Sequence, residues 1–592
     1  MKNARSRCAV SLVAIALSAA AACADDRDDF VAAPSFEVEA GADAPVCGYQ
    51  CSLNGRTVID TCTGEVAETC AAELACGGGR CQAPCAAAAA DGRSDGCEFF
   101  FQTPRFKKNL IQSCLAVYVV NTSLQPVDIS LELDGAALDV SKSVYRTNPG
   151  DAKLIPHEGA LPPGESAIVF VSDAPPDQSP PGLKAPCPKE VTPASYTDAL
   201  PDGTGFGTAF HLTTNLPVSV TSMYPFGGAV SYFPSATLLL PVATWSKQHI
   251  VVNGWEASTT GVPGAQIIAA EDDTEVTILP KRDTQDGENF VGGPAFTSRT
   301  YPLGKGQILQ LVQNEELSGS IVTSTKPTTI FGGHSCARLP ITGSACDILN
   351  QEIPGFERWG SEYVAVGYRP RTGNESEPVA YRIVAARDGT VLDYDPVPPP
   401  GAPLTMSAGE VALFIHGTGE PFVVRTQDAD HAIYVAAYMS GYQQGFAGPS
   451  GGDSNYAGQG DPEFVNVVPA GQYLNAYSFY ADPTYPETSL VIVRAKTTGQ
   501  FEDVWLECAG NVTGFRPIGT RGEYEWARVE LARGGNPGDS FDGGLCQTGL
   551  HRMRSEGAFT ATLWGWGFAA SYAYPGGMAQ RSLVASPLPP IR

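Results

Sequence analysis

The chain has 592 residues, of which 64 are glycine, 47 are proline and 17% are charged, while 43% are hydrophobic. This composition excludes a coiled coil, a collagen and a wholly disordered chain, and the length suggests about four domains of roughly 150 residues each. The formal net charge of -25 excludes a basic nucleic-acid footprint, so we expect no nucleic-acid partner.

The first 23 residues are typical of a secretory signal. Lys2, Arg5 and Arg7 form a positive segment, residues 8–22 are almost wholly apolar or small, and Cys23 follows directly. This apolar run is too short to span a bilayer, and it ends in small residues as signal peptides do. We therefore predict that the mature chain is exported.

Two forms of processing fit this segment. A signal peptidase cutting at the A-x-A pattern would release a secreted protein, whereas lipidation of Cys23 would anchor it to the bacterial outer membrane or cell surface. Loss of Cys8 with the signal leaves 15 of the 16 cysteines, an odd number, whereas lipidation of Cys23 leaves 14 that can all pair. We favour the lipoprotein, with residues 24–46 as an acidic tether and the lipid as the only membrane contact.

Residues 47–97 form a cysteine-rich segment with few large apolar residues. So short a segment cannot bury enough surface to fold without cross-links, and we predict a small domain held by disulfides. The cysteine spacing differs from the paired C-x2-C of zinc sites, so we expect no metal here. The connectivity stays open among eight cysteines: Cys47, Cys51, Cys62, Cys70, Cys76, Cys81, Cys85 and Cys97.

From residue 98 to 592, short alternating apolar segments are separated by clusters of Gly, Pro, Asn and Asp, which is typical of strands and tight turns. A proline followed by an aromatic residue recurs at Pro241, Pro354 and Pro469, at intervals of 113 and 115 residues. This predicts an all-β fold of about four tandem β-sandwich-like repeats, over residues 98–262, 263–375, 376–487 and 488–592. The alternative is a propeller-like or ring-closed array, in which Pro587 marks a terminal strand completing an earlier unit.

Six further cysteines lie in this body. We expect each to pair within its own repeat, because export favours oxidation. Cys97 is the open case, since it adjoins the body and is an alternative partner for Cys114 or Cys187. The expected pairs are Cys114 with Cys187, Cys336 with Cys346, and Cys508 with Cys546.

Several motifs follow one another along the body. They are Gly96-Cys97-Glu98-Phe99, the stretches 207–212, 231–241 and 269–276, Gly332-Gly333-His334-Ser335-Cys336, and Trp359-Gly360-Ser361-Glu362-Tyr363. Their order resembles the IgGFc-binding protein N-terminal domain family, as found in exported proteins of myxobacteria and related bacteria. The resemblance covers about residues 96–590 and implies a cell-surface, binding-type role. The family has no agreed catalytic motif to transfer, and nothing in these residues encodes recognition of Fc.

Two serines are candidate nucleophiles. Gly448-Pro449-Ser450-Gly451-Gly452 matches G-x-S-x-G, but its polar flanks do not fit the strand-turn-helix context of a nucleophile elbow. Ser335 follows a strand, yet Pro340 opposes a helix after it and Cys336 is expected to be in a disulfide. We therefore predict no catalytic residue, and we keep an exported hydrolase using Ser335, with His334 beside it, as the alternative.

No cofactor and no metal site is predicted. The seven histidines are scattered without an H-E-x-x-H motif. The acidic stretch from Glu271 to Glu275 is interpreted as a solvated hairpin turn, because neighbouring carboxylates on a strand point to opposite faces and cannot converge on calcium.

Trp564 and Trp566 alternate by two, so both indoles share one face of a strand. If that face is exposed, it is the best candidate contact patch in the sequence; if it is covered, both indoles belong to the core. The functional prediction is a non-catalytic cell-surface or envelope protein that binds a protein or glycan partner. A purely structural envelope component is the second alternative to the hydrolase.

Overall fold

The computed structural model describes residues 47–52, 55–108, 112–176, 185–227, 233–372, 377–417, 419–446 and 456–588. The predicted signal, Cys23, the tether and the motif around Ser450 lie outside these residues. The fold is all-β, as predicted; the described part contains one α-helix, α1 (Pro84–Asp91), and three short 3-10 helices. In the described residues, no helix has the length and apolar character needed to cross a membrane.

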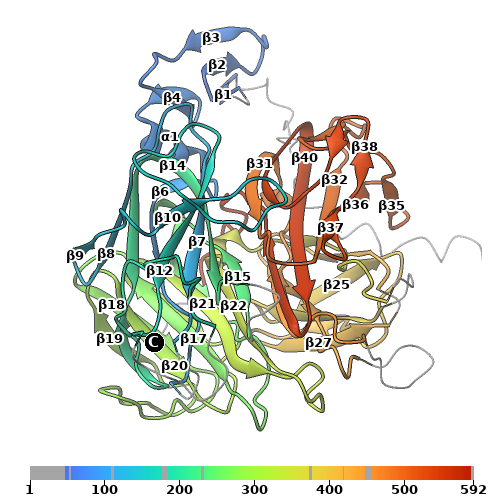
Figure 1. The fold of residues 1–592 in the computed structure, drawn as a ribbon. Helices are drawn as coiled ribbons and strands as arrows, with labels where there is room; N and C mark the ends of the chain where they lie inside the picture. Colours follow the sequence, from blue (N-terminus) through green and yellow to red (C-terminus); the bar gives the residue numbers. More distant parts are fainter. Residues whose placement is uncertain are drawn as a thin grey trace, which may run out of the picture.

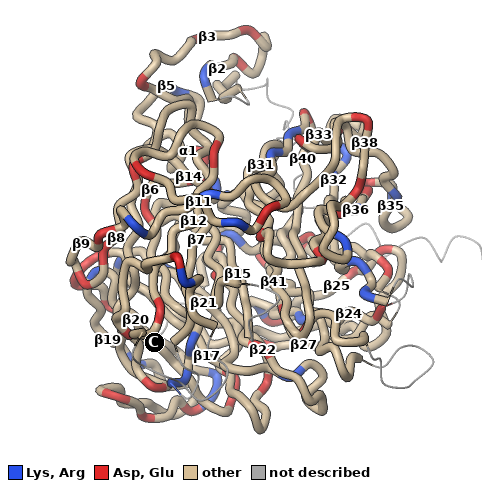
Figure 2. Tube along the Cα trace, viewed as in Figure 1, with Lys and Arg blue, Asp and Glu red and all other residues tan. Residues whose placement is uncertain are grey.

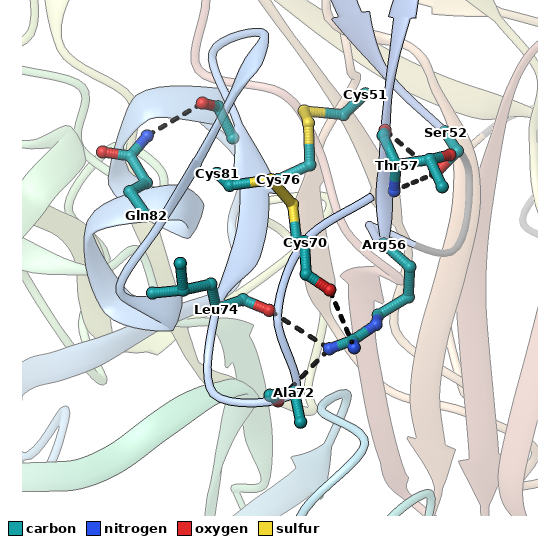
Figure 3. Close-up of a disulfide and its surroundings, with 11 residues drawn as sticks. Cys51, Ser52, Arg56, Thr57, Cys70, Ala72, Leu74, Cys76, Cys81 and Gln82 are labelled. Carbon is teal, nitrogen blue, oxygen red and sulfur yellow. Dashed lines mark hydrogen bonds between the residues drawn. A yellow bond between two sulfur atoms is a disulfide. The ribbon is translucent and has the colours of Figure 1, made fainter. Parts of the chain in front are cut away.

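The cysteine-rich segment is a small domain at the edge of the molecule (Figure 1). It contains a three-stranded sheet, β1 (Tyr49–Cys51), β2 (Thr57–Asp60) and β3 (Val66–Thr69), and a hairpin of β4 (Ala75–Gly77) and β5 (Arg80–Gln82). The guanidinium of Arg56 in this domain donates hydrogen bonds to the carbonyl oxygens of Cys70, Ala72 and Leu74 (Figure 3). The disulfides are Cys47–Cys62, Cys51–Cys76, Cys70–Cys81 and Cys85–Cys97.

Disulfides of the body join the pairs expected from the sequence, namely Cys114–Cys187, Cys336–Cys346 and Cys508–Cys546. Cys97 is bonded to Cys85 and not to either of its alternative partners. The bond to Cys85 links the strand that opens the body to helix α1, so it fixes the small domain to the first repeat.

Antiparallel sheets make up the body, and they follow one another along the chain. The first contains β6 (Gly96–Phe101), β7 (Leu115–Asn121), β8 (Ile129–Leu133), β9 (Ala136–Leu138), β10 (Val144–Arg146), β11 (Ile155–Pro156), β12 (Ser166–Ser172), β14 (Phe210–Tyr224) and β15 (Ser235–Leu238). The second contains β13 (Gly205–Thr208), β16 (Ser246–Ile250), β17 (Pro263–Ala269), β18 (Thr274–Leu279), β19 (Arg299–Leu303), β20 (Gln307–Val312), β21 (Ile321–Ala337) and β22 (Asp347–Ile353).

Strands of the third repeat form two four-stranded sheets, and those of the fourth form one large sheet with a small hairpin. The third repeat contains β23 (Glu362–Ala365), β24 (Val379–Ala385), β25 (Thr390–Asp395), β26 (Thr405–Met406), β27 (Val411–His416), β28 (Phe422–Thr426), β29 (Ile433–Met439) and β30 (Glu463–Asn466). The fourth contains β31 (Leu474–Ala481), β32 (Glu487–Ala495), β33 (Val504–Leu506), β34 (Gly510–Asn511), β35 (Arg516–Ile518), β36 (Tyr524–Arg533), β37 (Asn536–Pro537), β38 (Ser540–Phe541), β39 (Gly544–Leu545), β40 (Gly549–Gly567) and β41 (Ala570–Pro575).

The first strands of the later repeats begin earlier than the sequence boundaries suggest. β16, β23 and β31 all precede the boundaries at residues 263, 376 and 488, yet each pairs within the sheets of the repeat that follows. The 3-10 helices η2 (Val242–Thr244), η3 (Phe356–Arg358) and η4 (Ala470–Gln472) stand immediately before these strands. The proline landmarks therefore mark the starts of repeats 2 to 4.

The repeats close into a ring. Each repeat ends in a hairpin whose last strand faces the centre, and these inner strands, β15, β22, β30 and β41, contact one another in that cyclic order, with β41 returning to β15. Figure 1 shows the sheets arranged around this common centre. The sequence leaves open whether the repeats stand in a linear array or close into a ring. In the structure they close into a ring.

Four apolar cores lie between neighbouring repeats. Repeats 1 and 2, 2 and 3, 3 and 4, and 4 and 1 each share one cluster of buried side chains. In the last of these, Tyr118 of repeat 1 packs against Tyr480 of repeat 4 with ring centroids 4.8 Å apart, and its hydroxyl donates to Asp482. Each repeat thus buries surface against both of its neighbours.

Gln351, on β22, occupies the centre of the ring. Its side-chain amide donates three hydrogen bonds of 2.8 to 3.1 Å, to the carbonyl oxygens of Ala236, Phe464 and Ala573. These three acceptors belong to the other three inner strands. One fully buried side chain therefore joins all four repeats.

The ends of the ring are joined by backbone hydrogen bonds. Ser94 N–H donates to Met578 O at 2.9 Å and Gln580 N–H donates to Gly92 O at 2.6 Å. The chain then runs across repeats 3 and 2 without forming a strand, and Leu588 N–H reaches the side chain of Gln248. The expectation that Pro587 marks a terminal strand is wrong, because this segment is held by single hydrogen bonds and not by a sheet ladder.

We expect Gln351→Leu to lower the free energy of unfolding by about 2–4 kcal/mol, because it removes three hydrogen bonds and leaves buried carbonyls facing an apolar side chain. Chemical denaturation followed by intrinsic fluorescence measures this. Gln285→Leu is the control, because Gln285 is exposed in the loop between β18 and β19. Equal stability of the two variants would contradict the central role of Gln351.

Candidate functional site

Trp564 and Trp566 do not form a contact patch. Both are buried on β40 in the core shared by repeats 3 and 4. The ring of Trp564 lies 5.0 Å from that of Tyr368, and the guanidinium of Arg369 lies 4.7 Å from the ring of Trp566. The prediction that they share one face of a strand fits this arrangement, but repeat 3 covers that face, so the contact-patch hypothesis is wrong.

Ser335 lies inside the 17-residue strand β21 and is buried. Its hydroxyl accepts a hydrogen bond of 2.9 Å from Val262 N–H. His334 points to the opposite face, and both of its ring nitrogens have partners: Nδ1 accepts from Cys336 N–H and Nε2 bonds to Glu256 O. Burial lowers the pKa of His334 to about 3. This is the interior of a sheet, with neither the exposure nor the base that an acyl-transfer site needs.

The acidic stretch from Glu271 to Glu275 is a turn between β17 and β18. Asp273 has a positive φ of 53°, and Asp272 Oδ1 accepts a hydrogen bond from Lys305 N–H. Within the described ranges, no group of three or more His, Cys, Asp and Glu side chains is placed to hold a metal ion.

Buried carboxyl groups lie around the inner strands, where the sequence gave no indication of them. Burial, with Asp461 and Glu463 nearby, raises the pKa of Asp347 well above its ordinary value, and burial raises the pKa of Asp461 to about 8. Burial likewise raises the pKa of Glu463 well above its ordinary value. These shifts favour the neutral form of each carboxyl group, and among the described residues neither Asp347 nor Glu463 forms an ion pair.

These raised pKa values predict that stability falls as pH rises. A carboxyl group with a raised pKa binds its proton more tightly in the folded state, so its stabilising effect is full below about pH 4 and is lost as pH rises through the folded pKa, which for Asp461 is about 8. We expect the unfolding temperature to drop between pH 5 and pH 9, and to drop less in Asp461→Asn. Asp134→Asn, at an exposed turn, is the control. Parallel pH profiles of Asp461→Asn and the wild type would contradict this.

A groove lies on repeat 2. The second sheet has the strand order β13-β20-β17-β21-β18-β19 and curls so far that its last strand, β19, comes close to β20. β19 pairs with β18 alone, and a groove of about 880 Å³ runs along its other side. All of β19 lines this groove, together with Phe206 of β13, the turn at Asp272 and Asp273, and Gln307 of β20.

Tyr301 forms an aromatic wall in this groove. Its ring stacks on the buried Phe290, with centroids 4.7 Å apart and planes inclined by 23°. Its hydroxyl donates a hydrogen bond of 2.9 Å to Val291 O. Tyr301 lines the groove and Phe290 does not, so the tyrosine ring separates Phe290 from the open space.

The loop at 280–298 carries two large apolar side chains into solvent. Val291, which lines the groove, is 62% exposed and Phe296 is 73% exposed. Phe296 also has a positive φ of 58°, a conformation that a bulky residue seldom adopts. Hydrogen bonds across the loop, such as Thr284 N–H to Gly293 O, hold its shape. Exposed apolar side chains on an ordered loop are typical of contact surfaces.

Sequence reasoning did not identify Tyr301 and Val291 of the groove or Phe296 of the loop beside it. These three residues lie in a stretch rich in Gly, Pro and Asp, where no alternating pattern distinguishes a strand from a turn. The available signal was the presence of isolated large apolar residues inside a turn-rich segment.

Together these features define a class of protein: a disulfide-bonded, all-β chain whose sheets close into a ring and whose outer loops frame a groove. A model of the IgGFc binding protein family matches residues 235–565, which is more than half of the chain. The chain belongs to this family, and the resemblance inferred from its motifs is confirmed. The family is described by its name as binding IgG Fc.

A human relative, IgGFc-binding protein, is 23% identical over 296 residues. The aligned region covers 50% of this chain but 5% of the human protein, so the chain corresponds to a small part of that relative. The family match includes the groove on repeat 2 except for Phe206 of β13.

Proposed function

We propose that this protein is exported, is held at the cell surface, and binds a macromolecular partner, a protein or a glycan, without chemical turnover. The observation that carries the proposal is the pair of exposed apolar side chains, Val291 and Phe296, on the loop that borders the groove of repeat 2. The family supports a binding role. The name of the human relative states that it binds IgG Fc. Fc is therefore one of the protein partners to be tested for this chain.

The ring supplies what such a contact needs. The loop joins β18 to β19, and β18 is hydrogen-bonded to both β19 and β21. A partner therefore meets a preformed surface, and little conformational entropy is lost on binding. Acidic and basic residues are interspersed over the outer turns drawn in Figure 2, without a basic region that suits nucleic acid.

We expect the double variant Val291→Ser/Phe296→Ser to lose at least about tenfold in partner affinity, because truncating exposed apolar anchors typically costs more than about 1 kcal/mol. The purified chain is tested against the Fc fragment of IgG and against an oligosaccharide array. The matched control is Val397→Ser/Leu404→Ser, which changes two exposed apolar residues in the loop between β25 and β26 of repeat 3. Both variants should keep the wild-type unfolding temperature.

Equal binding by the wild type and the Val291/Phe296 variant would contradict the proposed surface. A folded wild-type chain that binds neither class of probe would contradict the partner classes named here.

Attachment to the cell surface is proposed to depend on lipid at Cys23, with secretion of the soluble chain as the alternative. We expect Cys23→Ser to move the protein from the membrane fraction to the soluble exported fraction, because the lipid is the only membrane contact proposed. Mass spectrometry of the wild-type N-terminus supplies the direct measurement. An unmodified N-terminus downstream of Cys23 would favour the secreted form.

A further inference from the structure

We propose that the groove of repeat 2 binds a neutral oligosaccharide, with Tyr301 as the stacking surface for one sugar ring. This inference rests on the proposed function and names the partner class for the same groove. A pyranose ring presents C–H groups on one face and hydroxyl groups around its edge. A site that fits it offers a fixed aromatic face surrounded by short polar side chains.

Tyr301 meets the first requirement because its ring is held on two sides. Phe290 supports one face at 4.7 Å, and the hydroxyl is tied to Val291 O at 2.9 Å. An aromatic ring fixed in this way loses little side-chain entropy when a ligand stacks on it. Tyr301 lines the groove and Phe290 does not, so the supported residue borders the space where a ligand enters.

The second requirement is met by polar side chains that line the same groove. Two of them are fixed by the backbone: Asp272 Oδ1 accepts from Lys305 N–H at 2.9 Å, and Gln307 Oε1 accepts from Gly304 N–H at 3.0 Å. Sugar hydroxyls both donate and accept, and the lining offers carboxylate acceptors beside amide and guanidinium donors. The polar lining consists of Asp272, Asp273, Asn289, Arg299, Thr300 and Gln307.

Charge favours a neutral sugar over an acidic one. The lining contains two carboxylates, Asp272 and Asp273, against one guanidinium, that of Arg299. A sialylated or sulfated glycan would bring its negative charge next to these acids, which costs free energy. A neutral oligosaccharide meets no such repulsion.

An extended peptide fits the groove less well. The side of β19 away from β18 is the place where a peptide strand would add to the sheet. Pro302 lies in the middle of β19 and has no N–H to offer, and proline on an edge strand is a common guard against strand addition. A protein partner would instead depend on the exposed Phe296, which does not line the groove.

The experiment measures binding of the full exported chain to an array of neutral oligosaccharides, with sialylated and sulfated glycans on the same array. We expect selected neutral glycans to bind and acidic ones to bind more weakly. Tyr301→Ala should weaken binding about tenfold, and Tyr301→Phe, which keeps the ring, should stay within about threefold of the wild type. Tyr196→Ala is the matched control, because Tyr196 is 39% exposed on repeat 1 and does not line the groove.

Thermal unfolding of each variant identifies loss of fold, and if Tyr301→Ala is destabilised, Asp273→Asn tests the same groove without touching the core. Sugar binding that survives both Tyr301→Ala and Asp273→Asn overturns the assignment to this groove. Binding of Fc but of no neutral glycan, with loss in Phe296→Ser, overturns the oligosaccharide and leaves the proposed function intact. Absence of binding to both classes of probe overturns both.

Discussion

Closure of the ring is the constraint on which the rest of this structure depends. Each repeat has a strand that is buried along its whole length, namely β7, β17, β24 and β41. A sheet that is apolar on both faces cannot stop at the end of a row without exposing one of them. The four cores between neighbouring repeats solve this problem, since each repeat contributes to two of them. The contact between residues 92–94 and 578–580 is therefore the point at which the last apolar face becomes covered.

This closure separates the parts of the chain that stabilise the fold from those available for contact. Trp564 and Trp566, the candidates for recognition in the sequence, lie in the core between repeats 3 and 4. The loops that connect the outer strands can differ in length between repeats. The hairpin β18–β19 of repeat 2 carries the loop 280–298, while the corresponding hairpin β25–β26 of repeat 3 carries the shorter connection 396–404. This longer loop borders the groove through Asn289 and Val291, together with β19 and residues of the curled sheet. Recognition placed on a loop that a rigid scaffold supports is a common division of labour.

Local signals in the sequence predicted much of the fold. Apolar alternation and turn residues predicted the strands, and proline landmarks about 114 residues apart predicted the repeats. Both signals can be recognised because each depends on a few residues that are close together in the chain. The location of Trp564 and Trp566 shows where such signals end. Their spacing places both indoles on one side of a strand, but only the neighbouring repeat determines whether that side meets water. The groove is harder still to predict from the sequence, because its lining residues come together only through the curvature of a whole sheet. They include Phe206, Asp272, Tyr301 and Gln307.

The centre of the ring places different demands on the four repeats. Each inner strand pairs with a single neighbour in its sheet, so its other edge carries backbone groups toward the axis, where water is excluded. A buried carbonyl without a donor costs free energy, and the close-packed axis has little room for several long side chains at one level. Gln351 of repeat 2 supplies the donor, while repeats 1, 3 and 4 offer the carbonyl oxygens of Ala236, Phe464 and Ala573. The four repeats are therefore not interchangeable at this level of the ring, because one side chain donates and three backbones accept.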